Sequence, residues 1–372
     1  MSVRHLYVHL PFCARRCGYC DFVTAVGRRG EHGAYVDALL AELELEREPL
    51  APELETIFLG GGTPTFTEPA ALERLLAALP DAAEVTVEAN PETVTPELAA
   101  LLSRNRVNRV SMGAQSFHTA LLDVLERRTT PDDVRRAFHT LRDAGFDNIS
   151  LDLIYGIPGQ EPADLRRDLE QALALEPEHL SCYELEAKPG TRFTHTFGNE
   201  LARQSEAMEG YFADVVDTLT AAGHRWYETA NFCRRPEDAG GRDLRSRHNL
   251  GYWLGCDYLG LGIGAVSTVD GLRRRNAPRL APYLAALTGG KGATAPPREL
   301  ERLSPETRRL ERVMLGLRLD EPLPLAGLEQ ALDPAGVARV ERLGLVERRG
   351  DALVLTPRGR LVGDGVTAEV VA

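Results

Sequence analysis

The stretch YVHLPFCARRCGYCDF, residues 7–22, contains three cysteines, Cys13, Cys17 and Cys20, in the spacing C-x3-C-x2-C. A loop this short can wrap three thiolates around one metal centre. Soft thiolates select iron–sulfur clusters, zinc or copper(I). A cluster of four irons held by only three thiolates has one iron without a protein ligand. The spacing therefore predicts an iron–sulfur site with an open position for a substrate or cofactor.

Two other interpretations of these cysteines stay open. A zinc ion needs a fourth ligand, which His9 could supply only if residues 10–12 folded back. A disulfide is disfavoured because the chain has only six cysteines among 372 residues and no secretory signal pattern, which favours a reducing compartment. The other three, Cys182, Cys233 and Cys256, are scattered singly and suit small apolar positions in a core.

Composition restricts the class of partner. The chain has 43 basic and 55 acidic residues, a net charge of −12, which argues against a nucleic-acid or anionic-membrane surface. No run of 18 or more apolar residues occurs, so no transmembrane segment is predicted. The expected protein is soluble and cytoplasmic.

Short apolar segments alternate with helical patterns along the chain. The predicted strands are HLYVHLPF (5–12), ETIFLGG (55–61), EVTVEAN (84–90), NRVSMGAQS (108–116), NISLDLIYG (148–156), HLSCYELEA (179–187) and HRWYETA (224–230). Helical spacing follows in residues 35–43 and 208–219. Such βα alternation gives a barrel or a doubly wound sheet. A partial barrel is favoured because candidate functional residues follow five or six successive strands.

These candidates lie at the carboxyl ends of the predicted strands. Residues 60–64, GGGTP, follow the second strand, and missing side chains would let backbone N–H groups approach a ligand. Glu88 follows the third strand, Gln115 the fourth and Asp152 the fifth. Each could be an ordinary structural residue. Together, on the rim that also holds the cysteine loop, they predict a polar ligand across the barrel mouth.

Six ordered motifs give the chain a family resemblance. They are YVHLPFC…C…YCDF, FLGGGTPT, VEANPE, RVSMGAQSF, LDLIYGIPGQ and HNLGYWLGCDYLGLGIGA, and they cover roughly residues 5–275. This series resembles the oxygen-independent coproporphyrinogen III oxidase-like branch of the radical S-adenosylmethionine (SAM) superfamily. The resemblance implies an α/β fold, a partial (β/α)6 TIM-like barrel. It also implies a 4Fe-4S cluster on the three cysteines, with SAM on the open iron.

The resemblance also implies site residues for SAM. By motif position they are Tyr7, Tyr19, Gly61, Gly62, Thr63, Glu88, Gln115, Arg127, Asp152 and Val266. Gly61, Gly62 and Thr63 would hold the amino group of SAM. Glu88 would lie on the ribose or adenine side, and Val266 would line the adenine pocket.

Within this branch, two positions favour a heme-chaperone subgroup. The dehydrogenases have a further cysteine two residues after the third, where this chain has Phe22, and they carry an N-terminal arm that precedes the cluster motif. The segment HNLGYW, residues 248–253, matches the subgroup's heme motif, which implies heme at His248. Neutral imidazole is a common axial ligand of heme iron. Taken alone, a histidine beside two aromatics is more often a packed core residue.

Three functions follow from the resemblance. The first is binding of heme and its transfer to heme-accepting proteins, with a possible homodimer. The second is oxidative decarboxylation of coproporphyrinogen III by an adenosyl radical, with flavodoxin or ferredoxin as electron donor. The third is radical-SAM methyl transfer to a ring substrate.

Arginines gather around the heme motif of an otherwise acidic chain. They are Arg234, Arg235, Arg242, Arg245, Arg247, Arg273, Arg274 and Arg275. Guanidinium groups bind carboxylates bidentately. One hypothesis is that some of these arginines hold the heme propionates, and the alternative is a solvated basic loop.

Three regions are predicted: a barrel over 1–235, a segment with the heme motif that completes the core over 236–297, and a C-terminal domain over 298–372. Residues 289–299 have a linker composition. In the last region Leu310, Val313 and Leu317 predict an amphipathic helix, and a turn at Gly344 precedes two short strands. This pattern resembles a winged helix. Because its basic residues are interleaved with acidic ones, packing or partner docking is favoured over DNA binding.

Overall fold

The main body is a parallel sheet with helices between its strands, as the alternation predicts. The structure, a computed structural model, describes residues 2–186, 192–289 and 292–372. Six strands pair in parallel in chain order: β1 (His5–Leu10), β4 (Leu54–Gly61), β5 (Ala82–Ala89), β6 (Arg109–Gln115), β7 (Ile149–Tyr155) and β8 (His179–Glu184). The helices between them are α1 (His32–Glu46), α2 (Pro69–Ala78), α3 (Pro96–Arg104), α4 (Thr119–Val124), α5 (Pro131–Asp143) and α6 (Pro162–Ala174). The partial (β/α)6 prediction is confirmed for this part of the chain.

The sheet continues beyond both ends of this unit. β11 (Tyr258–Leu261) pairs in parallel with β1, and β12 (Val266–Val269), β13 (Leu272–Asn276) and β14 (Arg298–Arg302) add on in antiparallel pairs. At the other end, β10 (Asn231–Arg234) pairs antiparallel with both β8 and β9 (His224–Trp226). Among the described residues the sheet runs from β14 to β9 without closing, so the barrel is partial.

One strand prediction needs correction. The segment 224–230 forms a strand only over His224–Trp226, and this strand does not join the parallel series next to β8. Asn231–Arg234 turns back and takes that place in antiparallel pairing. The prediction was wrong on this point because a hairpin of two short strands has the same local composition as one longer strand.

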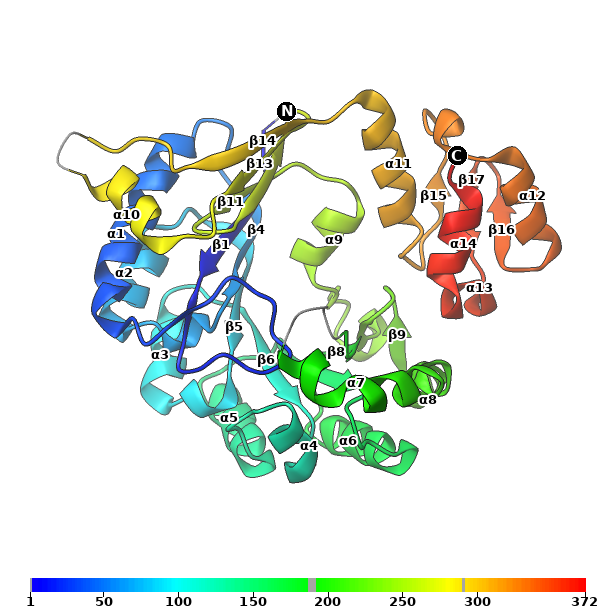
Figure 1. Cartoon of the computed structure of the whole chain (residues 1–372), viewed down its shortest axis with the longest axis horizontal. Helices are drawn as coiled ribbons and strands as arrows, with labels where there is room; N and C mark the ends of the chain where they lie inside the picture. Colours follow the sequence, from blue (N-terminus) through cyan, green and yellow to red (C-terminus); the bar gives the residue numbers. More distant parts are fainter. Residues whose placement is uncertain (1, 187–191, 290–291) are drawn as a thin grey trace.

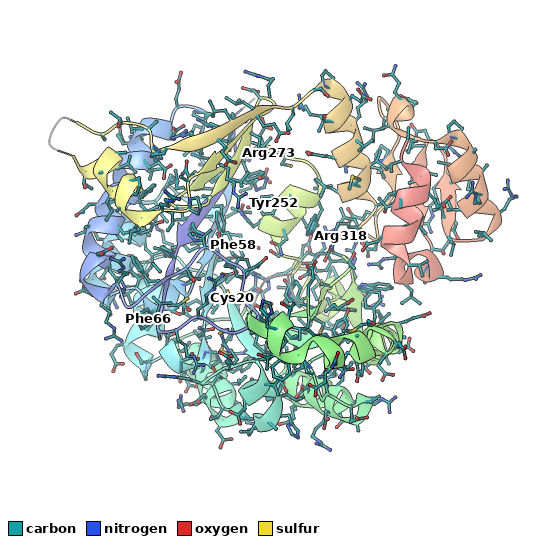
Figure 2. All side chains as sticks on the ribbon, in the orientation of Figure 1. Cys20, Phe58, Phe66, Tyr252, Arg273 and Arg318 are labelled. Atoms are coloured by element: carbon teal, nitrogen blue, oxygen red, sulfur yellow. The ribbon has the colours of Figure 1, made fainter. Side chains whose placement is uncertain are left out.

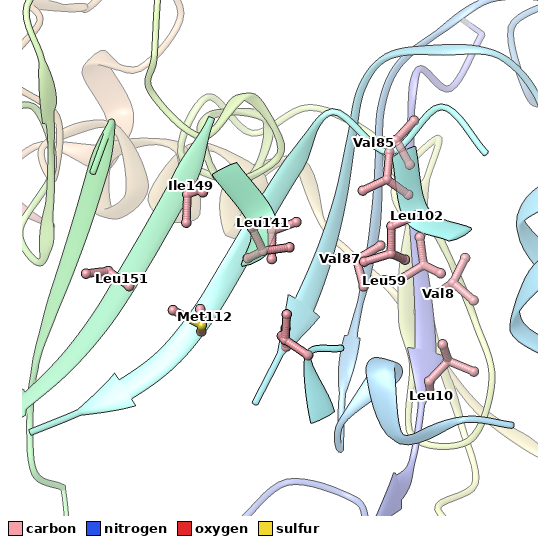
Figure 3. Packing of buried hydrophobic residues seen from close by; sticks show 14 of the residues in the cluster. Val8, Leu10, Leu59, Val85, Val87, Leu102, Met112, Leu141, Ile149 and Leu151 are labelled. Carbon is pink, nitrogen blue, oxygen red and sulfur yellow. The ribbon is translucent and has the colours of Figure 1, made fainter. Parts of the chain in front are cut away.

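Alternation along the strands separates two environments. Outward residues such as Val8, Leu59, Val87 and Met112 pack under the helices in one large apolar cluster. Figure 3 shows these side chains together with Leu102 from α3. Because successive strand residues point to opposite faces, the intervening residues face the barrel interior, and many of them are polar. The apolar layer stabilises the sheet, and the polar side chains of the interior are available for ligand binding or catalysis.

Further helices pack around the main sheet. α7 (Arg192–Ser205) and α8 (Met208–Ala221) follow β8, and α10 (Leu280–Thr288) packs on α1. The short helix α9 (Arg247–Trp253) lies between β4 and α11 (Pro305–Gly316) (Figure 1). Ser246 caps its N-terminus by accepting the backbone N–H of Asn249. The heme motif thus forms a helix that contacts the barrel interior.

The C-terminal region is a smaller unit with its own core (Figure 1). It contains α11 (Pro305–Gly316), α12 (Pro334–Arg342), α13 (Pro357–Leu361) and α14 (Gly363–Val370) with a sheet of β15 (Leu323–Pro324), β17 (Ala352–Leu355) and β16 (Val346–Arg349). The predicted helix, the turn at Gly344 and the two strands occur as expected. The division at 297/298 stays a prediction: β14 belongs to the main sheet, and residues 290–291 of the proposed linker lie outside the described residues.

Partly buried arginines hold this unit on the barrel. Arg225 of β9 forms a bidentate ion pair with Asp320, with N–O distances of 2.7 and 2.9 Å. Arg360 of α13 stacks its guanidinium 3.7 Å from the ring centroid of Trp226. In the described part of the chain, no helix combines the length and apolarity needed to cross a bilayer.

Candidate functional site

The cysteine loop is held at both ends. β2 (Phe12–Cys13) pairs with β3 (Ala25–Val26), which brings the start and end of the loop together. Cys13 is buried with its Sγ 3.6 Å from Thr63 Oγ1, and Cys17 and Cys20 are partly exposed. Arg127 is buried and places Nη1 3.9 Å from Cys17 Sγ. Three free thiols beside a buried guanidinium fit a thiolate-bound cluster, because the cation offsets the negative charge of the thiolates.

The zinc interpretation loses its fourth ligand. His9 donates from Nε2 to the Val23 carbonyl at 2.8 Å, and its Nδ1 accepts from the Tyr7 hydroxyl at 3.1 Å. Burial lowers the pKa of His9 to about 4, so its ring is neutral and both nitrogens are used. Among the described residues, no three His, Cys, Asp or Glu side chains converge tightly enough to hold a single ion.

The glycine turn forms hydrogen bonds with its neighbours. Its amides are already bonded: Gly61 N donates to Glu88 Oε2 at 3.0 Å, Gly62 N to Leu10 O at 2.8 Å and Thr63 N to Phe12 O at 2.9 Å. These N–H groups are therefore bonded within the protein, and a contact of this turn with a ligand stays a prediction. The glycines also allow close packing, since a Cβ on Gly61 would lie 2.5 Å from the His9 ring at a φ of +110°. An amino group requires acceptors, so this turn suits it only through carbonyls or the Thr63 hydroxyl.

A cavity of about 200 Å³ lies inside the barrel. The predicted site residues that line it are Tyr7, Gly61, Glu88, Asp152 and His248, together with Phe22, Phe58, Arg109, Ser111, Ser181, Tyr183, Asn249 and Tyr252. Figure 2 shows Phe58 and Tyr252 near the middle of the molecule, with Cys20 below them. Residues predicted for SAM and for heme thus share one cavity, which adjoins the cysteine loop at Phe22.

Other predicted SAM residues lie around this cavity. Gln115 ends β6 at a bulge with a left-handed φ of +65°, a strained conformation for a residue other than glycine. Arg127 donates from Nη2 to Asn90 Oδ1 and to the Gly113 carbonyl. Tyr19 packs against the apolar cluster of Leu121 and Phe193, and Val266 begins β12. Gln115, Arg127, Tyr19 and Val266 do not line the cavity.

Two carboxyl groups, those of Glu88 and Asp152, line the cavity. Burial, and next the nearby Asp152, raise the pKa of Glu88 to about 7, and the Gly61 N–H partly opposes the rise. Burial also raises the pKa of Asp152, although the hydroxyls of Ser181 and Ser111 hydrogen-bond to it. Glu88 therefore exchanges its proton near neutral pH, and the two carboxyls attract a cationic ligand when both are ionised.

Glu88→Gln is expected to stabilise the protein at pH 8 and to leave it unchanged at pH 4. The folded wild-type chain binds the proton of the Glu88 carboxyl more tightly than the unfolded chain does. The stability of the wild-type protein therefore falls as pH rises from about 4.5 to about 7. The loss is no more than about 3 kcal/mol, and cavity water reduces it. Urea unfolding across this pH range measures the effect. The exposed control Glu53→Gln should show none, and a pH-independent effect of Glu88→Gln would contradict the assignment.

His248 is buried and hydrogen-bonded at both ring nitrogens. Its Nδ1 lies 2.7 Å from Thr56 Oγ1, and its Nε2 lies 3.0 Å from the Tyr252 hydroxyl. The ring stacks on Phe58 with 5.1 Å between centroids. Burial lowers its pKa to about 3, so the imidazole is neutral, as a metal ligand must be. Its chemistry and aromatic surroundings fit a heme ligand once the Tyr252 hydroxyl moves away.

Most arginines of the predicted cluster form ion pairs or hydrogen bonds with other groups of the protein. Arg245 pairs with Asp243 and Glu321, Arg242 with Asp147, Arg273 with Glu311 and Arg274 with Glu46. Arg234 and Arg235 donate to backbone carbonyls. Arg247 and Arg275 are exposed. The propionate hypothesis therefore keeps Arg247 and Arg275 as its candidates.

Sequence reasoning did not single out Arg109. Its side chain is 2% exposed at the start of β6 and lines the cavity. It opposes the rise in pKa that burial causes at Glu84, Glu88 and Asp152. The alternation of side chains along the strand could have identified it. Arg109, Ser111 and Gly113 are alternate residues of β6, so they point to the same, interior face.

Comparisons with known proteins agree with this geometry. The Radical SAM superfamily model matches residues 7–172, and the HemN C-terminal domain model matches residues 303–362. A solved structure, coproporphyrinogen III oxidase (HemN) from Escherichia coli, superposes with a TM-score of 0.81 over 99% of this chain and 90% of that one, at 23% identity. That likeness supports the fold alone. The partial barrel and its cysteine loop define a radical SAM protein, a class whose cofactors are a 4Fe-4S cluster and SAM.

More similar relatives narrow the class. The protein named heme chaperone HemW from Mycobacterium tuberculosis is 38% identical over 97% of this chain and 93% of its own length. Its namesake from Bacillus subtilis is 32% identical over 98% of both chains, and that from Escherichia coli is 37% identical over 70% of this chain and 68% of its own length. The chain belongs to the heme chaperone HemW family.

Proposed function

We propose that this chain binds heme in the barrel cavity through His248 and transfers it to heme-accepting proteins. The observation that carries the proposal is the neutral His248 imidazole on the cavity wall, beside Phe58 and Tyr252. The curated relatives, named heme chaperones, support it. We place the protein in the cytoplasm and consider a homodimer its working form.

The proposed cofactor sites follow the same geometry. Cys13, Cys17 and Cys20 would hold the 4Fe-4S cluster, with Arg127 offsetting its charge. Glu88 and Asp152 would attract the sulfonium and ammonium charges of SAM, and Tyr7 would close the wall beside them. When bound, cluster and SAM supply one-electron cleavage of SAM, with a flavodoxin or ferredoxin as electron donor. The residues around them position the ligand and exclude water.

The cavity must open for these ligands. Its volume of about 200 Å³ is below the roughly 300–1,000 Å³ of pockets that enclose drug-sized ligands. Phe22 is 63% exposed at the cysteine loop, and Tyr252 covers His248 Nε2. We infer that loading displaces the side chains of Phe22 and Tyr252, because both lie on short segments at the cavity wall.

Heme titration of anaerobically prepared protein tests the proposed function. The wild type is expected to bind about one heme per chain, and His248→Ala should weaken binding at least tenfold, about 1.4 kcal/mol. His139→Ala, at an exposed position on α5, is the matched control and should bind as the wild type does.

A parallel assay separates the enzyme alternatives. With coproporphyrinogen III, SAM and a reductant, the proposal expects no protoporphyrinogen. Its formation would instead support the dehydrogenase, and a methylated product would support methyl transfer. Equal heme affinity in wild type and His248→Ala would remove His248 as the heme ligand.

A further inference from the structure

A series of hydrogen bonds connects the cavity with a second buried histidine behind the heme motif. The Tyr252 hydroxyl lies 3.0 Å from His248 Nε2, and His248 Nδ1 lies 2.7 Å from Thr56 Oγ1. The same Thr56 oxygen lies 2.9 Å from His5 Nδ1. Beyond it, His5 Nε2 lies 3.9 Å from the half-exposed Glu55 carboxylate, an ion-pair distance longer than a hydrogen bond, and Glu55 also pairs with Arg4. One fully buried threonine hydroxyl therefore joins two imidazoles that come from different segments of the chain.

The hydrogen bonds of this series are consistent with a single assignment of donors and acceptors. Both imidazole rings, His5 and His248, are buried, and a neutral buried imidazole carries a single N–H. Glu55 only accepts, which favours the proton of His5 on Nε2 and leaves His5 Nδ1 as an acceptor. Thr56 has one hydrogen, and it must then donate that hydrogen to His5 and accept from His248 Nδ1–H. The reverse order would point the Nε2 lone pair of His5 at a carboxylate.

The His248 ring is also fixed mechanically. Phe58 stacks on one face with an interplanar angle of 26°, and the Tyr252 ring meets it edge-on. Glu84, a buried carboxylate, accepts the backbone N–H of Arg247 and of His248 at 3.2 Å each. This carboxylate anchors the first turn of α9. The backbone and the ring of His248 are therefore both fixed by these contacts. The contact with Thr56 then determines the tautomer of the ring.

We propose that Thr56 and His5 are positioning residues that keep His248 in its Nδ1–H tautomer, so that the Nε2 lone pair faces the cavity as the ligand for heme iron. This inference rests on the proposed function. Metal-binding histidines commonly donate their other N–H to a fixed acceptor, and loss of that acceptor weakens metal binding about 10- to 100-fold. Here the acceptor is a hydroxyl whose own proton is directed by a second histidine. Tyr252 caps Nε2 until heme displaces it.

The first test needs no heme, and it uses a variant only to assign a signal. Selective 15N labelling of the histidines, with His248→Ala to assign the signal, reports by NMR which ring nitrogen of His248 carries the proton. The inference expects Nδ1–H and an unprotonated Nε2 at neutral pH. An Nε2–H tautomer in the wild-type protein would overturn it.

The second test compares Thr56→Val with Thr56→Ser. Valine keeps the shape but removes the hydroxyl, so heme affinity should fall about tenfold and the ferric heme absorption and spin-resonance spectra should change. Serine keeps the hydroxyl and should restore both. Glu55→Gln, at a half-exposed position, should give a smaller loss without risk to folding. Circular dichroism before titration checks that each variant is folded.

His248→Ala separates the two proposals. Heme binding that is lost in His248→Ala but unchanged in folded Thr56→Val and Glu55→Gln overturns the positioning role alone. Unchanged binding in His248→Ala overturns the heme site and, with it, this inference. Weakened binding in Thr56→Val that serine restores, together with the Nδ1–H signal, supports both.

Discussion

Replacing Cys13, Cys17 and Cys20 together by alanine is expected to abolish binding of the iron–sulfur cluster completely. The three thiols are the cysteine side chains of one loop whose ends are pinned by β2 and β3, and no fourth cysteine lies in that loop. An iron–sulfur cluster needs thiolate ligands, and none would be left here. Iron and sulfide analysis after anaerobic reconstitution, with spin resonance of the reduced protein, measures the result.

Three single variants serve as controls for this experiment. Cys182→Ala, Cys233→Ala and Cys256→Ala change cysteines outside the loop and should keep wild-type iron and sulfide content. Iron retained by the triple variant would show that the cluster site lies elsewhere. Stoichiometric zinc in wild-type protein purified without oxygen would restore the zinc interpretation.

Arg109→Met is expected to destabilise the protein by about 3–5 kcal/mol at pH 8. Arg109 is buried in the barrel and offsets the carboxylates of Glu84, Glu88 and Asp152, all three with pKa values that burial raises. Without the guanidinium these charges are uncompensated in a place with little water. At pH 5 more of them are protonated, and the destabilisation should shrink. Chemical unfolding at both pH values measures the difference.

Arg104→Met is the matched control for Arg109. Arg104 ends α3 with its side chain 52% exposed in an ion pair to Glu73, and exposed pairs contribute about 0–1 kcal/mol. Its loss should therefore have little effect at either pH. An Arg109→Met variant as stable as Arg104→Met at pH 8 would show that the interior carboxyls are already neutral.

The parts of the site that sequence predicted are those set by local pattern. The C-x3-C-x2-C spacing restricts all three thiols to one loop, whatever the rest of the chain does. Strand ends could be located because apolar alternation stops there, and so Glu88 and Asp152 were found on the barrel wall. His248 came from a short motif, and its helix begins where Ser246 caps it.

Other parts could not be read from local pattern. The glycine turn was expected to offer N–H groups, but strand register pairs Gly62 with Leu10 and Thr63 with Phe12. The segment after Trp226 reverses, and Asn231–Arg234 pairs antiparallel with both β8 and β9, which local composition does not reveal. The arginines around the heme motif found carboxylates from distant segments, Asp147 and Glu321 among them.

By itself, the sequence determined the cysteine loop, the alternation of strands and helices and the presence of a histidine next to two aromatics, because each depends on neighbours within a few residues. The tertiary structure alone decided what these groups do for one another. Thr56 and His248 are 192 positions apart, and their hydrogen bond exists only because α9 packs on β4. Arg109 lies near Glu84 and Asp152 for a related reason. Inward positions on parallel strands converge only when the sheet curves.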